Sequence, residues 1–224
     1  MSEQNAKEAL FREKFEHYTK ENNTLKNATY YALKEAILLQ LFQDEITENQ
    51  IASILGVSRT PIREAMLQLS RDGLLEITHG KKAKIVPLTT QDIYDIAVIL
   101  ESLHRLAIEQ CVERATEEDL HQMEETVALI NFYTGRKDMR HLTECNTRFH
   151  LQIAKFSKNK WLLDIMDRLL SYTLIYREFA VSRPGRMEEA CKEHTELYDV
   201  ICQRDAKKAE GMIEEHVKRA FGIA

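Results

Sequence analysis

The chain has 224 residues, a formal net charge of −5, seven glycines, three prolines and four cysteines. This length is sufficient for two modest domains, each with its own core. No apolar run approaches the 18 residues of a membrane span, the charged N-terminus is unlike a signal peptide, and no CxxC spacing occurs. We therefore expect a cytoplasmic protein with reduced thiols, no disulfide framework and no membrane partner.

Residues 1–26 are a charged N-terminal extension with sparse apolar positions at Leu10, Phe15 and Tyr18. Terminal segments of this kind are poorly ordered unless something ties them to a domain. We expect a mobile or loosely docked helix there and assign it no function. The first helix of the following domain is expected at about residues 27–41.

Two helices joined by a tight turn are predicted next. Thr47 and Gln50 have the spacing of a capping box at the start of the first helix, and Gly56 ends that helix. Gly-Val-Ser then forms the turn, Ser58 is placed to cap the second helix, and Pro61 falls in its first turn, where a missing N–H is harmless. This order of features is typical of a helix-turn-helix.

The second of these helices presents arginines on its outer face. Ile62, Met66 and Leu69 recur at the spacing of one helical face and form its core side. Arg59 and Arg63 are four residues apart and therefore lie together on another face. A helix N-terminus attracts phosphate, and the guanidinium fork matches the O6 and N7 atoms of guanine. The pattern predicts DNA-facing side chains at Ser58, Arg59 and Arg63.

A β-hairpin is expected after Gly73, which stops the helix. Apolar residues alternate with polar ones on both sides of a His79-Gly80 turn, from Leu75 to Ile85. The tip of this hairpin carries three lysines suited to phosphates or to a minor groove, namely Lys81, Lys82 and Lys84.

The charge of this region supports a role in DNA binding. Residues 58–84 contain six Lys or Arg against three acidic residues, a net +3 within an acidic chain. Such a local basic footprint suits a sequence-specific DNA binder. The alternative is an ordinary capped surface helix with solvated arginines followed by a basic loop.

From residue 90 onward the sequence predicts only helices. Capping and breaking residues divide it into six segments at about residues 90–112, 116–136, 138–157, 160–180, 186–203 and 206–221. The expected fold class is mainly α. A winged helix-turn-helix with a small β-hairpin at residues 27–88 precedes an all-α bundle at residues 89–224.

Four polar side chains of this bundle are placed to converge. Asn146 and His150 lie four apart on one predicted helix, so both address one point. His194 and His216 each lie eleven residues from Asp205, which marks a turn, so they come level in an antiparallel helix pair. Three imidazoles and an amide oxygen suit zinc, nickel or manganese. The alternative is that these are scattered histidines in a chain that has eight.

The first domain carries a family resemblance. LKEAI (33–37) and GVSRTPIREAMLQLSRDGLLEITHGKKAKIVPL (56–88) resemble the winged helix-turn-helix of the GntR family of bacterial transcription regulators. The resemblance implies contacts to operator DNA from Ser58, Arg59, Thr60 and Arg63. It also implies that His79 and Gly80 enter the minor groove.

The second domain resembles the FCD ligand-binding domain of the FadR subfamily. Its D-x-x-x-H signature, followed by two histidines in the final helices, appears here with an amide in place of the aspartate, as Asn146, His150, His194 and His216. The resemblance implies a divalent metal at these residues and an effector carboxylate bound by Arg105.

Four further residues are candidates for the same cavity. Tyr172 and Tyr176 are expected either to line it or to belong to the core, and Cys145 and Cys191 to be either soft ligands or buried inert thiols.

The leading hypothesis is a homodimeric, ligand-responsive transcription regulator that is not an enzyme. It is expected to act as a repressor on a palindromic operator and to bind a small carboxylate effector, through a metal, in its helical domain. One alternative is a metal-dependent hydrolase, because three histidines with an open position can activate water. The other is a metal-free acyl-CoA-type sensor on the same fold.

Overall fold

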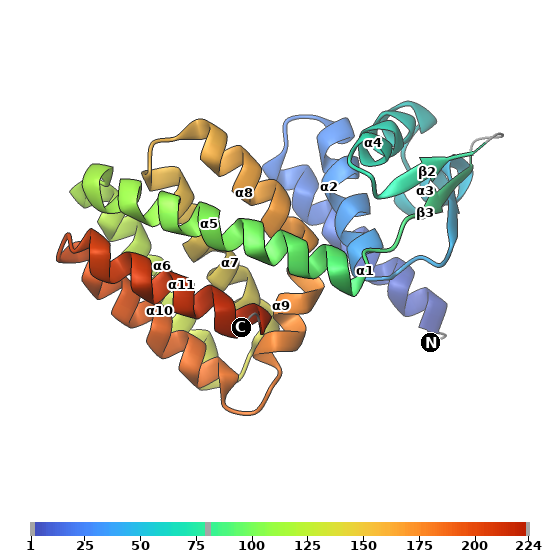
Figure 1. Ribbon diagram of the computed structural model, residues 1–224. Coiled ribbons are helices and arrows are strands. Elements are labelled where there is room, and N and C mark those ends of the chain that lie inside the picture. Colours follow the sequence, from blue (N-terminus) through green and yellow to red (C-terminus); the bar gives the residue numbers. More distant parts are fainter. Residues whose placement is uncertain (1–2, 79–81, 223–224) are drawn as a thin grey trace. The chain divides into compact units, whose positions relative to one another are not determined.

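The computed structural model describes residues 3–78 and 82–222, and the chain divides into two compact units, Met1–Thr89 and Thr90–Ala224 (Figure 1). The N-terminal unit contains four helices and three short strands within the described residues. They are α1 (Glu3–Glu21), α2 (Leu25–Leu38), β1 (Glu45–Thr47), α3 (Glu48–Leu55), α4 (Arg59–Arg71), β2 (Leu75–Ile77) and β3 (Lys82–Ile85).

Helix α1 packs firmly on α2, so the expectation of a mobile or loosely docked extension was wrong. Phe11 is fully buried and meets Phe42 edge to face at 5.1 Å between ring centroids. The Arg12 Nε–H donates to the carbonyl of Ile54 at 2.8 Å, and Lys14 forms an ion pair with Glu35. These contacts hold α1 on the rest of the N-terminal unit, which its charged composition did not indicate.

The helix-turn-helix is built by local signals. The Thr47 hydroxyl accepts a hydrogen bond from the Gln50 N–H at 3.1 Å and begins α3. Gly56 ends α3 in the left-handed conformation, at φ +69°, which favours glycine. Ser58 is the residue before α4 as predicted, although its hydroxyl makes no capping hydrogen bond within the described part of the chain. Ile62 is among the α4 residues that form the buried face.

A three-stranded antiparallel sheet follows in the order β1-β3-β2. The predicted hairpin is present in its β2 and β3 arms, where Ile77 pairs with Ala83. Strand β1 was not predicted, because three residues next to a helix cap are too short to show a period. The predicted turn at His79-Gly80 and the adjacent Lys81 lie outside the described residues.

The C-terminal unit is entirely helical within the described residues, which confirms the predicted mainly α fold. Its helices are α5 (Thr90–Arg114), α6 (Glu117–Arg136), α7 (Met139–Phe156), α8 (Lys160–Tyr172), α9 (Leu174–Val181), α10 (Arg186–Cys202) and α11 (Ala206–Phe221). Several begin at a side-chain cap. Thr116 and Asp119 form a reciprocal capping box, and Asp138, Asn159 and Asp205 each accept a hydrogen bond from a first-turn N–H.

The single helix predicted at residues 160–180 is instead two helices that meet at Thr173. The Leu170 carbonyl accepts from the Thr173 N–H at 3.2 Å, from the Thr173 hydroxyl at 3.0 Å and from the Arg177 guanidinium at 2.9 Å. This competition for one carbonyl diverts the regular helical bond and breaks the helix. Arg177 lies on α9, after the break, so the sequence next to Thr173 does not predict where the helix breaks.

The core of this unit surrounds α7, which packs against α5, α6, α8, α9 and α10 (Figure 1). Phe149 and Phe156 of α7 are fully buried, as are Leu100 and Ile108 of α5. Among the described residues, no helix combines the length and the apolar character needed to cross a membrane.

Candidate nucleic-acid interface and candidate metal centre

The start of α4 presents polar side chains to solvent. Ser58, Arg59 and Thr60 are all exposed, and Ile62 of the next turn is fully buried beneath them. The free N–H groups of this helix end and the adjacent guanidinium form a surface that suits a phosphate backbone. The structure thus brings the predicted reading residues together at one helix end.

Arg63 lies on the exposed side of α4 but is held by a carboxylate of α3. Its Nε and Nη2 atoms donate to the two carboxylate oxygens of Glu48 at 2.8 and 3.2 Å. The Glu48 side chain is 6% exposed and that of Arg63 is 54% exposed. Hydrogen bonding by Glu48 raises the pKa of Arg63. A fork–fork pair of this kind fixes the direction of a side chain as well as its charge.

The hairpin arms add basic side chains to the same unit. Lys82 is half exposed and lies 3.6 Å from a carboxylate oxygen of Glu45 on β1, while Lys84 is exposed on β3. The other predicted contacts of the hairpin, at His79, Gly80 and Lys81, are outside the described residues.

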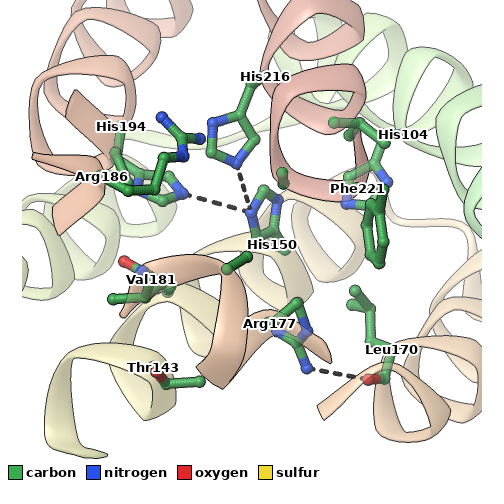
Figure 2. Close-up of a pocket in the computed structure, with 15 residues that line it drawn as sticks. His104, Thr143, His150, Leu170, Arg177, Val181, Arg186, His194, His216 and Phe221 are labelled. Atoms are coloured by element: carbon green, nitrogen blue, oxygen red, sulfur yellow. Dashed lines mark hydrogen bonds between the residues drawn. The ribbon is translucent and has the colours of Figure 1, made fainter. Parts of the chain in front are cut away.

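Three histidines meet inside the C-terminal unit, as the helix register predicted. His150 comes from α7, His194 from α10 and His216 from α11 (Figure 2). The Nε2 atom of His150 lies 3.3 Å from Nε2 of His194 and 3.2 Å from Nε2 of His216. One ring nitrogen of each residue falls within 4.8 Å of the others, and all three residues are buried.

Burial keeps these rings suited to metal binding. Desolvation is the largest cause that lowers the pKa of His150 and of His194 well below the usual value. Their neutral forms are therefore favoured, and a neutral imidazole has a lone pair for a cation.

Glu193 of α10 orients the third ring. Its Oε2 accepts from Nδ1 of His216 at 2.7 Å, and its two oxygens also accept from Arg186 at 3.0 and 2.7 Å and from Arg219 at 2.8 Å. Burial alone would raise the pKa of Glu193, but the hydrogen bonds from His216 and Arg186 lower it strongly. With Nδ1 of His216 engaged, its Nε2 points toward the other two rings, as in carboxylate-histidine-metal arrangements.

Asn146 adds a polar group to the cavity that holds the three histidines. It lines the same cavity, is buried, and its Oδ1 has no hydrogen-bond partner within the described structure. A buried acceptor left without a partner calls for an explanation, and a cation is one that an amide oxygen accommodates. The donor set therefore fits a divalent metal.

The cavity lining has four further polar residues that the sequence did not indicate, His104, Thr143, Arg177 and Arg186. His104 of α5 and Arg177 of α9 are both buried and line it, together with apolar residues of α8, α9 and α11 (Figure 2). The cavity volume is about 40 Å³. This corresponds to roughly three water positions, which is enough for a small molecule only.

Arg105 is not at the cavity, contrary to the prediction. Its half-exposed side chain lies 3.8 Å from a carboxylate oxygen of Glu210 and 3.9 Å from one of Glu214, both on α11. One residue of helix corresponds to a rotation of about 100°. Since His104 points inward, its neighbour Arg105 must point away.

The remaining candidates also lie outside the cavity lining. The hydroxyl of Tyr172 accepts a hydrogen bond from the Arg168 guanidinium. The hydroxyl of Tyr176 donates a hydrogen bond to the carbonyl of Phe221 at 3.0 Å. Cys191 donates to Asn131, and burial raises the pKa of Cys145. Both cysteines therefore take the buried, inert alternative.

A helix-turn-helix with a β-hairpin, followed by an all-α unit with a polar cavity, defines a bacterial transcription regulator with a separate helical domain. Residues 25–85 match the family described as bacterial regulatory proteins, gntR family, and residues 92–219 match the FCD domain. The chain belongs to the GntR family, and its FCD domain places it in the FadR-type subfamily.

Relatives that are named as HTH-type transcriptional regulators match most of the chain. The chain is 31% identical to the HTH-type transcriptional regulator YdhC of Bacillus subtilis (strain 168), over 84% of this chain and 85% of that protein. It is 18% identical to the HTH-type transcriptional repressor RspR of Escherichia coli (strain K12), over 77% and 76% of the two chains. The solved structure of E. coli McbR/YncC has the same fold, with a TM-score of 0.79 at 19% identity over 90% of this chain and 97% of that one.

Proposed function

We propose that this regulator binds a palindromic operator as a homodimer and represses transcription until a small organic acid occupies a metal-containing cavity in its FCD domain. The observation that carries this proposal is a cavity that holds three converging buried imidazoles and Asn146, whose Oδ1 has no hydrogen-bond partner among the described residues. That site belongs to a chain whose other unit is a DNA-binding helix-turn-helix.

The metal is proposed to be held by His150, His194, His216 and Asn146. Neutral nitrogen donors with one oxygen donor suit zinc, nickel or manganese. When bound, such an ion supplies a Lewis-acidic position for a carboxylate oxygen. Glu193 supports the site by fixing the ring of His216 through the 2.7 Å hydrogen bond to its Nδ1.

The effector is proposed to be a small carboxylic acid that faces Arg177 rather than Arg105. Arg177 is a buried cation of the cavity lining, and the Thr147 hydroxyl and the Leu170 carbonyl accept hydrogen bonds from its guanidinium at 2.6 and 2.9 Å. These two contacts direct the side chain, and its charge favours an anionic ligand. A cavity with room for roughly three waters is too small for an acyl-CoA.

For DNA binding, we propose contacts from Ser58, Arg59, Thr60 and Arg63, with Lys82 on the phosphates. The remaining proposed contacts come from the hairpin tip at His79, Gly80 and Lys81. One reading helix covers few base pairs, and two-fold regulators read half-sites about one helical turn apart. A homodimer is therefore the expected form of the regulator.

Exposed apolar side chains of the C-terminal unit support a dimer. Ile99 and Leu106 on α5, and Trp161 and Ile165 on α8, are all exposed, and these two helices pack against each other. Large apolar residues that a folded unit leaves exposed can belong to an interaction site. Sedimentation should show about 52 kDa, twice the chain mass of 26.1 kDa.

The metal proposal is tested by elemental analysis of protein purified without chelator or affinity tag, followed by reconstitution with zinc, nickel or manganese. Stoichiometric metal that is lost in His194→Ala is the expected result. His121→Ala is the matched control, since His121 is an exposed histidine on α6. Binding that survives His194→Ala, or no metal in either preparation, would overturn the metal site.

The effector proposal is tested by thermal shift with small mono- and dicarboxylates. A hit should stabilise wild-type protein, change its operator affinity and lose its effect in Arg177→Met. A ligand must bind the DNA-competent and DNA-incompetent states unequally to have an effect on the operator. The hydrolase alternative receives no support from the relatives, which are named as transcription regulators.

A further inference from the structure

The side chain of His104 has a determined tautomer. Its Nδ1 atom lies 2.7 Å from the backbone carbonyl oxygen of Leu100, one turn earlier on α5. A carbonyl oxygen only accepts hydrogen bonds, so Nδ1 carries the proton. In the neutral ring, Nε2 then presents a lone pair and acts only as an acceptor.

That lone pair has no partner in the described part of the chain. The Nε2 atom of His104 is fully buried and accepts no hydrogen bond, and the residue, 1% exposed, lines the cavity. A buried acceptor of this kind is normally satisfied by protein, water or a ligand. Since His104 lines the cavity, a small donor in the cavity can approach this atom.

His104 stands beside the proposed metal ligands but outside their set. Its ring meets that of His150 edge to face at 4.9 Å between centroids. The group of ring nitrogens that lie within 4.8 Å of one another contains His150, His194 and His216 only, among the described residues. The lone pair of His104 is therefore left for another occupant of the cavity.

We infer that His104 is a specificity residue that accepts a hydrogen bond from a hydroxyl group of the effector, so that the effector is a small hydroxylated carboxylic acid. This inference rests on the proposed function, because it places the carboxylate toward the metal and Arg177. A carboxylate has only acceptor oxygens and cannot satisfy the acceptor of His104. A second group with a donor is required.

A hydroxyl is the donor that the charges of the cavity favour. An ammonium group would bring a further positive charge near the buried guanidinium of Arg177 and near a divalent cation. A neutral hydroxyl avoids this repulsion. The small volume also limits the acid to a few carbon atoms.

The test uses matched acid pairs that differ by one hydroxyl: glycolate with acetate, lactate with propanoate, and malate with succinate. Affinity is measured by calorimetry on the full chain, loaded with whichever of zinc, nickel or manganese binds stoichiometrically. In wild-type protein, the hydroxylated member of at least one pair should bind about tenfold more tightly, the scale of one net hydrogen bond. In His104→Phe this ratio should fall to about one while metal content is unchanged, and in the exposed control His121→Phe it should persist.

A second readout does not depend on a variant that folds. In wild-type protein labelled with ¹⁵N-histidine, the unprotonated Nε2 resonance of His104 should move with the hydroxylated acid and stay with its partner acid. Equal binding within every pair, or a preference that survives His104→Phe, would overturn the role of His104 and leave the proposed function standing. If no acid of any pair binds, the proposed effector function itself fails. Loss of metal in His104→Phe would make His104 a ligand and also overturn the inference.

Discussion

Replacing Glu193 by glutamine should weaken metal binding without removing any proposed ligand. The amide has nearly the shape of the carboxylate but loses its charge, while His216, Arg186 and Arg219 all direct donors at it. Loss of such a supporting group typically costs about 10–100-fold in metal affinity, which is about 1.4–2.7 kcal/mol. The buried Arg186 also loses one of its two carboxylate partners, Glu193, and keeps Glu189 at 3.6 Å. Metal-free Glu193→Gln should therefore be less stable by about 3 kcal/mol, the lower end for a broken buried pair.

The assay is competition with a chelator of known affinity, combined with urea unfolding in excess chelator. Glu196→Gln is the matched control, because Glu196 lies on the same helix and is half exposed. Its carboxylate lies 3.7 Å from the exposed ammonium group of Lys192, which is a weak surface ion pair. That control should change neither quantity by more than about 0.5 kcal/mol. Wild-type metal affinity in Glu193→Gln, together with lowered stability, would refute the reasoning and leave Glu193 as an anchor for Arg186 alone.

Three further predictions follow from the two units. Asn146→Asp should tighten metal binding about tenfold in the same competition assay, because the negative charge of the new carboxylate attracts the cation. Arg63→Ala should cost about 1–3 kcal/mol at a specific operator, whereas Lys82→Ala should weaken all sequences alike and lower the salt slope by about one in binding titrations. Burial alone would raise the pKa of Asp119, but hydrogen bonds from Lys158 and Thr116 lower it. Asp119→Asn should therefore reduce the unfolding free energy by about 1–2 kcal/mol at pH 7. This difference should shrink as pH falls below about 4, where the carboxylate of the unfolded chain becomes protonated, and should be lost once pH falls below the lowered pKa of the folded state.

Helix limits and the meeting of the histidines were predictable because both depend on short-range geometry. Asn159 and Asp205 accept hydrogen bonds from N–H groups three residues ahead, so the signal and its effect lie in one turn. Equal spacing of His194 and His216 from Asp205 is likewise sufficient to bring them level once the two helices run antiparallel.

The features that were not predicted depend on contacts that reach beyond one helical turn. The break at Thr173 involves a guanidinium seven residues from the carbonyl that it occupies, and α1 is anchored in part by a carbonyl of α3, 42 residues away. On α5, the choice between His104 and Arg105 is a choice of helix face. Apolar residues occur on several faces of that helix. The sequence therefore does not show which of the two adjacent positions points inward.

The three converging histidines lie far apart along the chain, since His194 follows His150 by 44 positions and His216 follows it by 66. An ion bound to all three acts as a cross-link that closes two long loops and fastens α7, α10 and α11 together. Free metal at a concentration of a hundred times its dissociation constant would stabilise the folded state by about 2.7 kcal/mol. The melting temperature of the C-terminal unit then becomes a gauge of free metal concentration, and apparent affinities for any effector are comparable only between samples of equal metal loading.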